Sequence, residues 1–314
     1  TMGKKKIVLI GASNSMLFNG LRAGLNQDNV ELTNLSLGGA STLHILYEFL
    51  RFRNESIVIA ADLIILESNI VDIDHIIDLP DFKNLILRNI FLTYNELSKL
   101  NKKFLVLLLP YIKNDFKKNE TINNAHRMCC NQYGFNCVDV QSVYLKNNVM
   151  DFYMTMMPDK AHQLQRIMYE FGKNIANENF SLFKFSLPSS IDLDFKICSP
   201  KNDLQINEKI LNLKKNMFYK EYCFRVHKDI TISLSRKNQN YKIIASHSWT
   251  DNGKKNPFKF YSSLIFFNNA DNFIETCATP SYNAFAAIYD DFVIGDNSKI
   301  YLGNNRNINY YDLV

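Results

Sequence analysis

The chain has 314 residues, 46% of them hydrophobic, and a formal net charge of +5 at pH 7. This length suits two domains with packed cores, at about 150 residues per domain. Because lysines occur along the whole chain, they form no concentrated basic face, and nucleic-acid binding is disfavoured. No apolar run approaches the ~20 residues that cross a bilayer, so no transmembrane segment is predicted.

The six cysteines show no paired C-x-x-C spacing, so we expect no structural zinc site. No other metal and no cofactor are expected. Lys4–Lys6 followed by Ile7–Ile10 only superficially resembles a signal peptide, because the apolar run is too short. The lack of a signal peptide and of a clear disulfide pattern favours a cytoplasmic protein. A leader peptide that has been removed stays open as an alternative. The oligomeric state is not indicated.

Buried-strand patterns alternate with helical patterns over the first 178 residues. Strands are predicted at 5–10, 30–36, 62–67, 103–109 and 136–140, and helices at 15–27, 41–54, 83–101, 120–133 and 163–177. Repeated strand-helix-strand units with right-handed connections form a parallel sheet with helices on both faces. We therefore predict that residues 1–180 form a three-layer α/β/α sandwich with a five-stranded, flavodoxin-like sheet.

The pattern changes after residue 180 to an alternation with a period of two, which is typical of half-buried strands. The segments that show it are 183–185, 191–197, 230–234, 241–249 and 258–267. Asn252-Gly253, within 250–253, is a strong signal for a hairpin between the last two segments. Residues 181–314 are predicted to form a mainly antiparallel β-domain, of the sandwich type.

Four blocks of residues follow the predicted strands or open the last helix. Ser13 stands on a turn after the first strand, and Asp159 precedes His162 by three residues. Gly39 and Asn69 follow the second and third strands. Because the carboxyl ends of parallel strands share one edge of the sheet, these residues are expected to converge. Ser, His and Asp are the nucleophile, base and orienting group of acyl-transfer chemistry.

In order and spacing, these blocks resemble the SGNH hydrolases, also called the GDSL esterase and lipase superfamily, over residues 5–178. The resemblance implies that Ser13, Asp159 and His162 are catalytic. It also implies an oxyanion hole made by the N–H groups of Ser13 and Gly39 and the side-chain amide of Asn69.

Two blocks depart from the family pattern. Ala12 replaces the aspartate of the first block, and Glu67-Ser68-Asn69-Ile70 replaces the usual Gly-x-Asn-Asp. Neither lost residue performs covalent chemistry in the family, so the resemblance still implies ester chemistry but no particular subfamily.

The resemblance implies a serine esterase that removes an acyl group, with an O-acetyl group favoured, from a carbohydrate or glycan through an acyl-serine. The expected partner is thus a small-molecule ester or an acylated glycan. Aromatic residues of the β-domain that are candidates for stacking on sugar are Tyr222, Trp249, Tyr261, Tyr282, Tyr301, Tyr310 and Tyr311. Trp249 is the candidate substrate-binding residue, and the β-domain is interpreted as an accessory, glycan-binding module.

Other interpretations remain open at this stage. The same Ser-His-Asp set serves an O-acyltransferase if a sugar hydroxyl replaces water. A non-catalytic glycan-binding or assembly protein on the same scaffold is a further alternative. A nucleotide-binding loop at 11–15 is disfavoured because the segment lacks the lysine and glycines of a Walker loop. Taken alone, Asp159 is most simply a helix cap.

Overall fold

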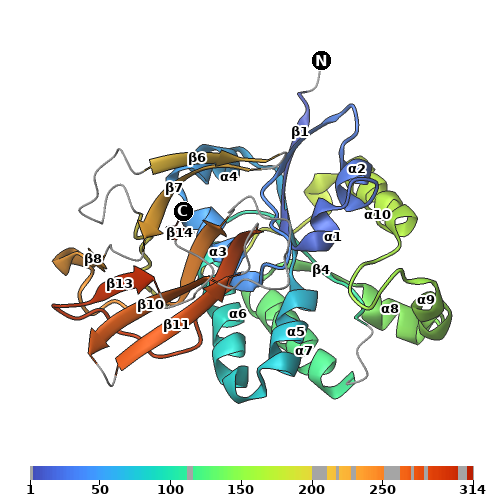
Figure 1. Cartoon of the computed structure of the whole chain (residues 1–314). Coiled ribbons are helices and arrows are strands. Elements are labelled where there is room, and N and C mark those ends of the chain that lie inside the picture. Colours follow the sequence, from blue (N-terminus) through green and yellow to red (C-terminus); the bar gives the residue numbers. More distant parts are fainter. Residues whose placement is uncertain are drawn as a thin grey trace. The chain divides into compact units, whose positions relative to one another are not determined.

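We describe the protein from a computed structural model (Figure 1). The structure describes residues 3–111, 116–199, 211–216, 219–227, 231–250, 262–269, 272–278, 282–302 and 310–313. The chain divides into two units, Thr1–Phe195 and Lys196–Val314.

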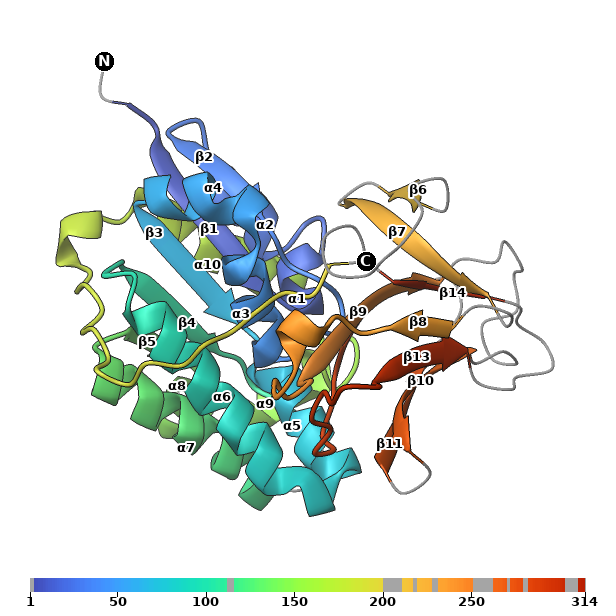
Figure 2. The ribbon, with the colours of Figure 1, turned by 90° about the vertical axis from the view of Figure 1, so that its left-hand side faces the viewer.

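A parallel sheet forms the centre of the first unit (Figure 2). Its strands are β1 (Lys5–Gly11), β2 (Val30–Asn34), β3 (Leu63–Glu67), β4 (Phe104–Leu108) and β5 (Asn136–Asp139). Their order in the sheet is β2-β1-β3-β4-β5, and every neighbouring pair is parallel. β3 and β4 are buried along their whole length, as expected for apolar strands covered on both faces. The predicted five-stranded parallel sheet is confirmed.

Helices cover both faces of this sheet. They are α1 (Ser13–Met16), α2 (Leu21–Leu25), α3 (Thr42–Leu50), α4 (Glu55–Ala60), α5 (Asn69–Asp78), α6 (Lys83–Ser98), α7 (Phe116–Tyr133), α8 (Val140–Lys146), α9 (Met150–Met156) and α10 (Gln165–Asn177). α2 packs against α10 on one face, and α3, α6 and α7 pack together on the other (Figure 2). The connection from β1 to β2 runs towards one side of the sheet, and the later connections, from β2 through to β5, run towards the other side. Because these crossovers are right-handed, the helix after β1 lies on the opposite face to the helices of the later connections.

Several helices differ from the predicted ones. The segment 15–27 forms two short helices, because the chain leaves the helical conformation at Leu17. The helix predicted at 41–54 ends at Leu50, where Arg51 becomes extended. The helices α5, α8 and α9 were not predicted.

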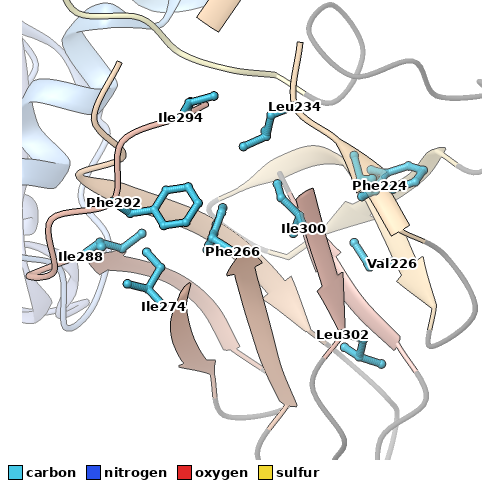
Figure 3. Packing of buried hydrophobic residues seen from close by; sticks show 11 residues of the cluster. Phe224, Val226, Leu234, Phe266, Ile274, Ile288, Phe292, Ile294, Ile300 and Leu302 are labelled. Carbon is cyan, nitrogen blue, oxygen red and sulfur yellow. The ribbon is translucent and has the colours of Figure 1, made fainter. Parts of the chain in front are cut away.

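Two antiparallel sheets form the second unit. Their strands are β6 (Leu211–Lys215), β7 (Lys220–His227), β8 (Thr231–Ser233), β9 (Ala245–Thr250), β10 (Ser262–Asn269), β11 (Asn272–Ala278), β12 (Tyr282–Ala287), β13 (Lys299–Leu302) and β14 (Tyr310–Leu313). The sheet orders are β11-β10-β13-β8 and β12-β9-β14-β7-β6. Buried side chains from both sheets, such as Val226, Phe266 and Ile300, form one apolar cluster (Figure 3). The predicted antiparallel β-domain is confirmed.

The structure places the boundary between the units after Phe195 rather than after residue 180. Within 181–195 the backbone returns to the first unit, where the Ser186 N–H donates to Lys102 O over 2.8 Å and the Leu187 N–H donates to Tyr133 O over 2.7 Å. The strands predicted at 183–185 and 191–197 are wrong, apart from one isolated bridge between Lys103 and Phe185. The alternation there reflects packing onto the first unit and not membership of a sheet.

The predicted hairpin turn at 250–253 lies outside the described residues from position 251 onward. The strands on its two sides, β9 and β10, belong to different sheets. They therefore do not pair as a hairpin, and that pairing was wrong.

Within the described ranges, no helix is long and apolar enough to cross a membrane. They also contain no group of three or more His, Cys, Asp or Glu side chains that could hold a metal ion.

Candidate active site

Ser13 follows the carboxyl end of β1 and is the first residue of α1. The turn before it is crowded and requires a glycine. A Cβ at Gly11 would lie 2.3 Å from Ser15 Oγ and 2.6 Å from Glu67 O. The glycine therefore lets β1 pass close to β3 while the next residues turn out of the sheet. This turn holds the Ser13 hydroxyl at the sheet edge.

His162 meets Ser13 across 149 positions of sequence. Its Nε2 lies 2.9 Å from Ser13 Oγ, and its Nδ1 lies 2.7 Å from Asp159 Oδ2. The His162 side chain is 35% exposed and that of Asp159 49% exposed, so the base is accessible from solvent. The three residues thus form a continuous serine-histidine-carboxylate chain.

Asp159 also shapes the loop that carries His162. Its Oδ1 accepts the backbone N–H groups of Ala161 and His162, each over 2.8 Å. Partial burial works to raise the pKa of Asp159, but the hydrogen bonds from the His162 ring and these two N–H groups outweigh it, so the pKa is lowered. Asp159 does not cap α10, whose first residue is Gln165. One carboxylate thus folds the loop and orients the ring.

A buried carboxylate lies under the serine turn. Glu67, at the end of β3, is 0% exposed, and its Oε2 accepts the Ala12 N–H over 3.1 Å and the Ser15 hydroxyl over 2.9 Å. Burial raises the pKa of Glu67 to about 7, against the lowering effect of those hydrogen bonds and with a further rise from the charge of Asp72. Glu67 therefore braces the residues on both sides of Ser13. It also explains why Ser15, fully buried, points away from His162.

Two backbone N–H groups at the site have no acceptor among the described residues. They belong to Ser13 and to Gly39. Gly39 lies in an exposed turn after β2 with a φ of 70°, a left-handed conformation that suits glycine. Unpaired N–H groups of this kind are available to a developing negative charge.

The structure gives Asn69 other partners. Its Nδ2 donates to Leu109 O and to Asn123 Oδ1, both over 2.9 Å, and its Oδ1 accepts the Leu109 N–H. An amide nitrogen carries two hydrogens, and both are used here. This corrects the expectation that the Asn69 amide is available to the oxyanion. Asn69 instead joins the start of α5 to the end of β4 and to α7.

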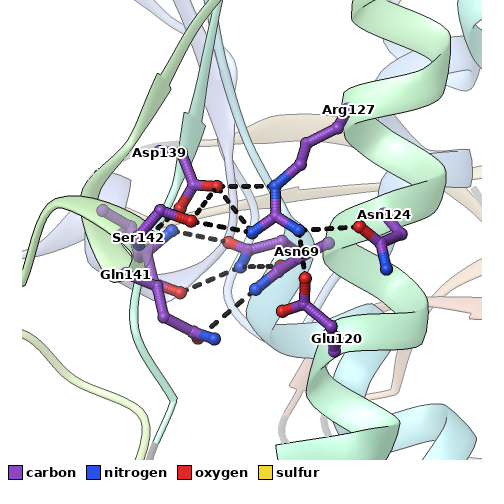
Figure 4. Close-up of polar contacts among 9 residues, drawn as sticks. Asn69, Glu120, Asn124, Arg127, Asp139, Gln141 and Ser142 are labelled. Atoms are coloured by element: carbon purple, nitrogen blue, oxygen red, sulfur yellow. Dashed lines mark hydrogen bonds and ion pairs between the residues drawn. The ribbon is translucent and has the colours of Figure 1, made fainter. Parts of the chain in front are cut away.

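The network continues away from the site (Figure 4). Asn123 donates to Gln141 Oε1 over 3.3 Å. Arg127 on α7 binds Asp139 over 2.6 Å and Ser142 Oγ over 3.0 Å. Asp139 is also the N-cap of α8 and accepts the Ser142 N–H in its first turn. These contacts fix α7 against β5 and α8, and through Asn123 they fix Asn69.

Two residues near the triad were missed by sequence reasoning. Asn14 and Gln163 are each 1% exposed and lie next to Ser13 and His162. The Asn14 side chain contacts the backbone of Ala161 and Gln163. An asparagine beside a serine on a turn carries no sequence signal of its own, since such residues usually bond their local backbone.

The structure corrects the expectation for Trp249. Its side chain is 6% exposed and therefore offers no open ring face for stacking on sugar. Tyr222 is exposed, at 64%, and Tyr301 is half-buried. Tyr261 lies outside the described residues, and for Tyr282, Tyr310 and Tyr311 the structure describes the strand but not the side chain.

No protein-family model matches the chain, and no curated protein does so either. Solved structures give weak similarities. An alpha/beta hydrolase, LAE5, from the metagenome of Lake Arreo is 17% identical, with a TM-score of 0.45 over 57% of this chain and 99% of its own. A catalytic mutant of Axe2, an acetylxylan esterase from Geobacillus stearothermophilus, is 16% identical, with a TM-score of 0.45 over 57% of this chain and 97% of its own. The acetyl xylan esterase AlAXEase is 18% identical, with a TM-score of 0.42 over 54% of this chain and 96% of its own.

Proposed function

We propose that the first unit is a serine esterase of the SGNH type that cleaves an ester through an acyl-serine intermediate. The observation that carries this proposal is the chain of contacts from Ser13 Oγ to His162 Nε2 and from His162 Nδ1 to Asp159 Oδ2. Both separations are within hydrogen-bonding range, and the middle residue is a histidine with a carboxylate on its far nitrogen. This is the arrangement in which a serine hydroxyl becomes a nucleophile.

The reaction then proceeds in two steps. His162 Nε2 accepts the Ser13 proton as Oγ attacks the ester carbonyl, and returns that proton to the leaving alcohol as the carbon–oxygen bond breaks. In the second step His162 takes a proton from water as the water oxygen attacks the acyl-serine carbonyl. His162 then returns this proton to Ser13 Oγ as the bond between the acyl carbon and Oγ breaks and the acid leaves. The Asp159 carboxylate accepts the Nδ1 hydrogen throughout and stabilises the charged ring. A sugar hydroxyl in place of water would complete an acyl transfer with the same residues.

The oxyanion that forms in each step needs hydrogen-bond donors. The unpaired N–H groups of Ser13 and Gly39 are the proposed donors. The loss of one such donor in a serine hydrolase costs roughly 2.7–4 kcal/mol of barrier. A side-chain substitution cannot remove a backbone N–H donor. A substitution of Gly39 acts instead on the backbone conformation, because at a φ of 70° any side chain strains the turn.

For the substrate we propose an O-acetylated carbohydrate or glycan. The support for this substrate is the exposure of the site. Gly38 and Gly39 are open to solvent and Asp159 is half-exposed. An open site of this kind can accept an acyl group that is carried on a large alcohol. The β-rich second unit is proposed as the accessory, glycan-binding part.

The experiment compares wild type with Ser13→Ala and Ser15→Ala on p-nitrophenyl acetate. Ser13→Ala should abolish release of p-nitrophenol with the fold intact. Ser15→Ala is the matched control, because this hydroxyl is two positions away and donates to Glu67 instead of His162. Equal hydrolysis by wild type and Ser13→Ala would refute the serine mechanism.

A further inference from the structure

The catalytic contact joins two segments that have little regular structure of their own. Ser13 begins a helix of four residues without a side-chain cap. His162 lies in the irregular segment between α9, which ends at Met156, and α10, which begins at Gln165. Asp159 folds this segment internally but does not attach it to α1. Some other contact must therefore set the distance between the nucleophile and the base.

Asn14 makes that contact. Its Nδ2 donates to Ala161 O over 3.1 Å, and its Oδ1 accepts the Gln163 N–H over 2.9 Å. The two backbone groups belong to the residues immediately before and after His162. The amide thus binds its partner segment as a neighbouring strand would, with one donor and one acceptor on either side of the base.

The surroundings make this contact rigid. Asn14 is 1% exposed, and both of its polar atoms are used at this site. Gln163 is itself held, because its Nε2 donates to Pro110 O over 2.8 Å and its Oε1 accepts the Tyr153 hydroxyl over 2.8 Å. The loop is therefore fixed from three sides: by Asn14, by the end of β4 and by α9.

We propose that Asn14 is a positioning residue that holds His162 Nε2 against Ser13 Oγ. This inference rests on the proposed esterase function. Without the amide, the Gln163 N–H loses its acceptor, and the Ala161 carbonyl keeps only the longer bond from Gln163 Nε2, at 3.4 Å. The loop must then shift to satisfy these groups. A shift of about 1 Å between reacting groups can cost about 100-fold in rate. The residue does not touch the substrate, so its removal should slow the chemical step more than it weakens binding.

Asn14→Ala and Asn14→Asp are the test variants. Asn14→Asp keeps the size and the acceptor for Gln163, but it places a carboxylate oxygen against the Ala161 carbonyl. Both should lower kcat for p-nitrophenyl acetate by about 100-fold with a change in KM of only a few-fold. Both should also slow the labelling of Ser13 by a fluorophosphonate, which reports on the activated serine without turnover.

Asn136→Ala is the matched control. Asn136 makes a similar clamp at the opposite edge of the sheet, donating to Phe104 O and Lys184 O and accepting the Lys184 N–H, over 2.8, 3.0 and 3.0 Å. Its removal should lower the melting temperature without changing kcat per folded molecule. An Asn14 variant that is folded and retains wild-type kcat and labelling would overturn the positioning role while leaving the esterase intact. If wild type itself neither hydrolyses esters nor labels at Ser13, the proposed function fails and the role of Asn14 fails with it.

Discussion

Asp159 combines a structural role with an orienting role, although it does not cap α10. Its Oδ1 accepts two backbone N–H groups, which is a structural role, and its Oδ2 orients His162. The two roles lie on different oxygens, so they can be separated by substitution. The Glu67 carboxylate differs, because both of its hydrogen bonds are to the serine turn and neither is to His162.

Asp159→Asn should remove the orienting role and retain most of the structural one. The amide oxygen can still accept the N–H groups of Ala161 and His162, while the NH₂ group would face Nδ1 and favour the wrong histidine tautomer. In a serine protease the equivalent change lowers kcat about 10⁴-fold. We expect a loss of comparable order, with a melting temperature within a few degrees of wild type. Asp159→Ala, which loses both roles, should be less stable. If Asp159→Asn unfolds while activity per folded molecule is unchanged, the carboxylate is structural only.

Glu67 makes stability depend on pH. The pKa of Glu67 is raised by burial to about 7 in the folded protein, from 4.5. Below pH 4.5 the Glu67 carboxyl group is protonated in both the folded and the unfolded protein, so its burial carries no cost of charge. As pH rises towards about 7, the unfolded chain ionises first, so stability falls, by at most about 1.4 kcal/mol per pH unit.

Glu67→Gln tests this dependence, because the neutral amide keeps an oxygen for the Ala12 N–H and the Ser15 hydroxyl. Urea unfolding of wild type and variant should give free energies that converge near pH 4.5 and diverge by pH 8, with the variant the more stable at the higher pH. Parallel curves across this range would show that the burial of Glu67 has no net electrostatic cost.

The helices α2 and α10 pack closely enough to bring their backbones into contact. A Cβ at Gly172 would lie 2.4 Å from Leu21 O and 2.8 Å from Leu25 N, and one at Gly24 would lie 2.0 Å from Tyr169 O. The two helices follow the segments that carry Ser13 and His162, so their spacing also supports the site. Neither residue can gain a methyl group unless the helices move apart.

Gly172→Ala should therefore destabilise the first unit by about 1–3 kcal/mol, the usual cost of overpacking, although alanine is the better helix former. Gly20→Ala is the control, because a Cβ there would have its nearest neighbour at 3.6 Å. Thermal unfolding followed by circular dichroism distinguishes the two. A Gly172→Ala variant as stable as Gly20→Ala would show that the helices separate at no cost.

The sheet was predictable from sequence because its strands are continuous apolar runs that end at glycine or polar residues, as β1 does at Gly11. The Ser-His-Asp set was predictable because Ser13 directly follows such a strand and Asp159 precedes His162 by three residues. The helix α5 was not, since its first turns are rich in β-branched residues that have weak helix propensity, and burial of Ile70, Ile73 and Ile76 stabilises it instead. The partners of Asn69 depend on α7 and β4, which are distant in sequence.

The two units each have their own buried core, and every residue of the proposed site belongs to Thr1–Phe195. The segment 181–195 belongs to this first unit through several contacts. The Ser186 hydroxyl donates to Ser98 O over 3.1 Å, and the Ser189 hydroxyl donates to Asn95 Oδ1 over 2.5 Å. Truncation can therefore test whether the first unit performs the chemistry while the second unit selects the substrate.

A fragment that ends at residue 195 should fold and retain hydrolysis of p-nitrophenyl acetate, while its action on an acetylated glycan should fall much further, because remote binding energy positions a large substrate. A fragment that ends at residue 180 loses the contacts of Ser186 and Ser189 and should be less stable. Melting temperatures and the two activities decide the matter. A folded 195-residue fragment that loses both activities equally would show that the second unit completes the site.

Trapping of the acyl-enzyme is the direct test of Ser13 as the nucleophile. Wild type is mixed with p-nitrophenyl acetate, quenched in acid within the pre-steady-state burst, and digested for mass spectrometry, with His162→Ala and Ser13→Ala treated in parallel. An acetyl group is expected on the peptide that contains Ser13 in wild type, and none is expected at that position in either variant. Acetylation confined to other residues, or wild-type turnover with Ser13 unmodified throughout, would contradict it.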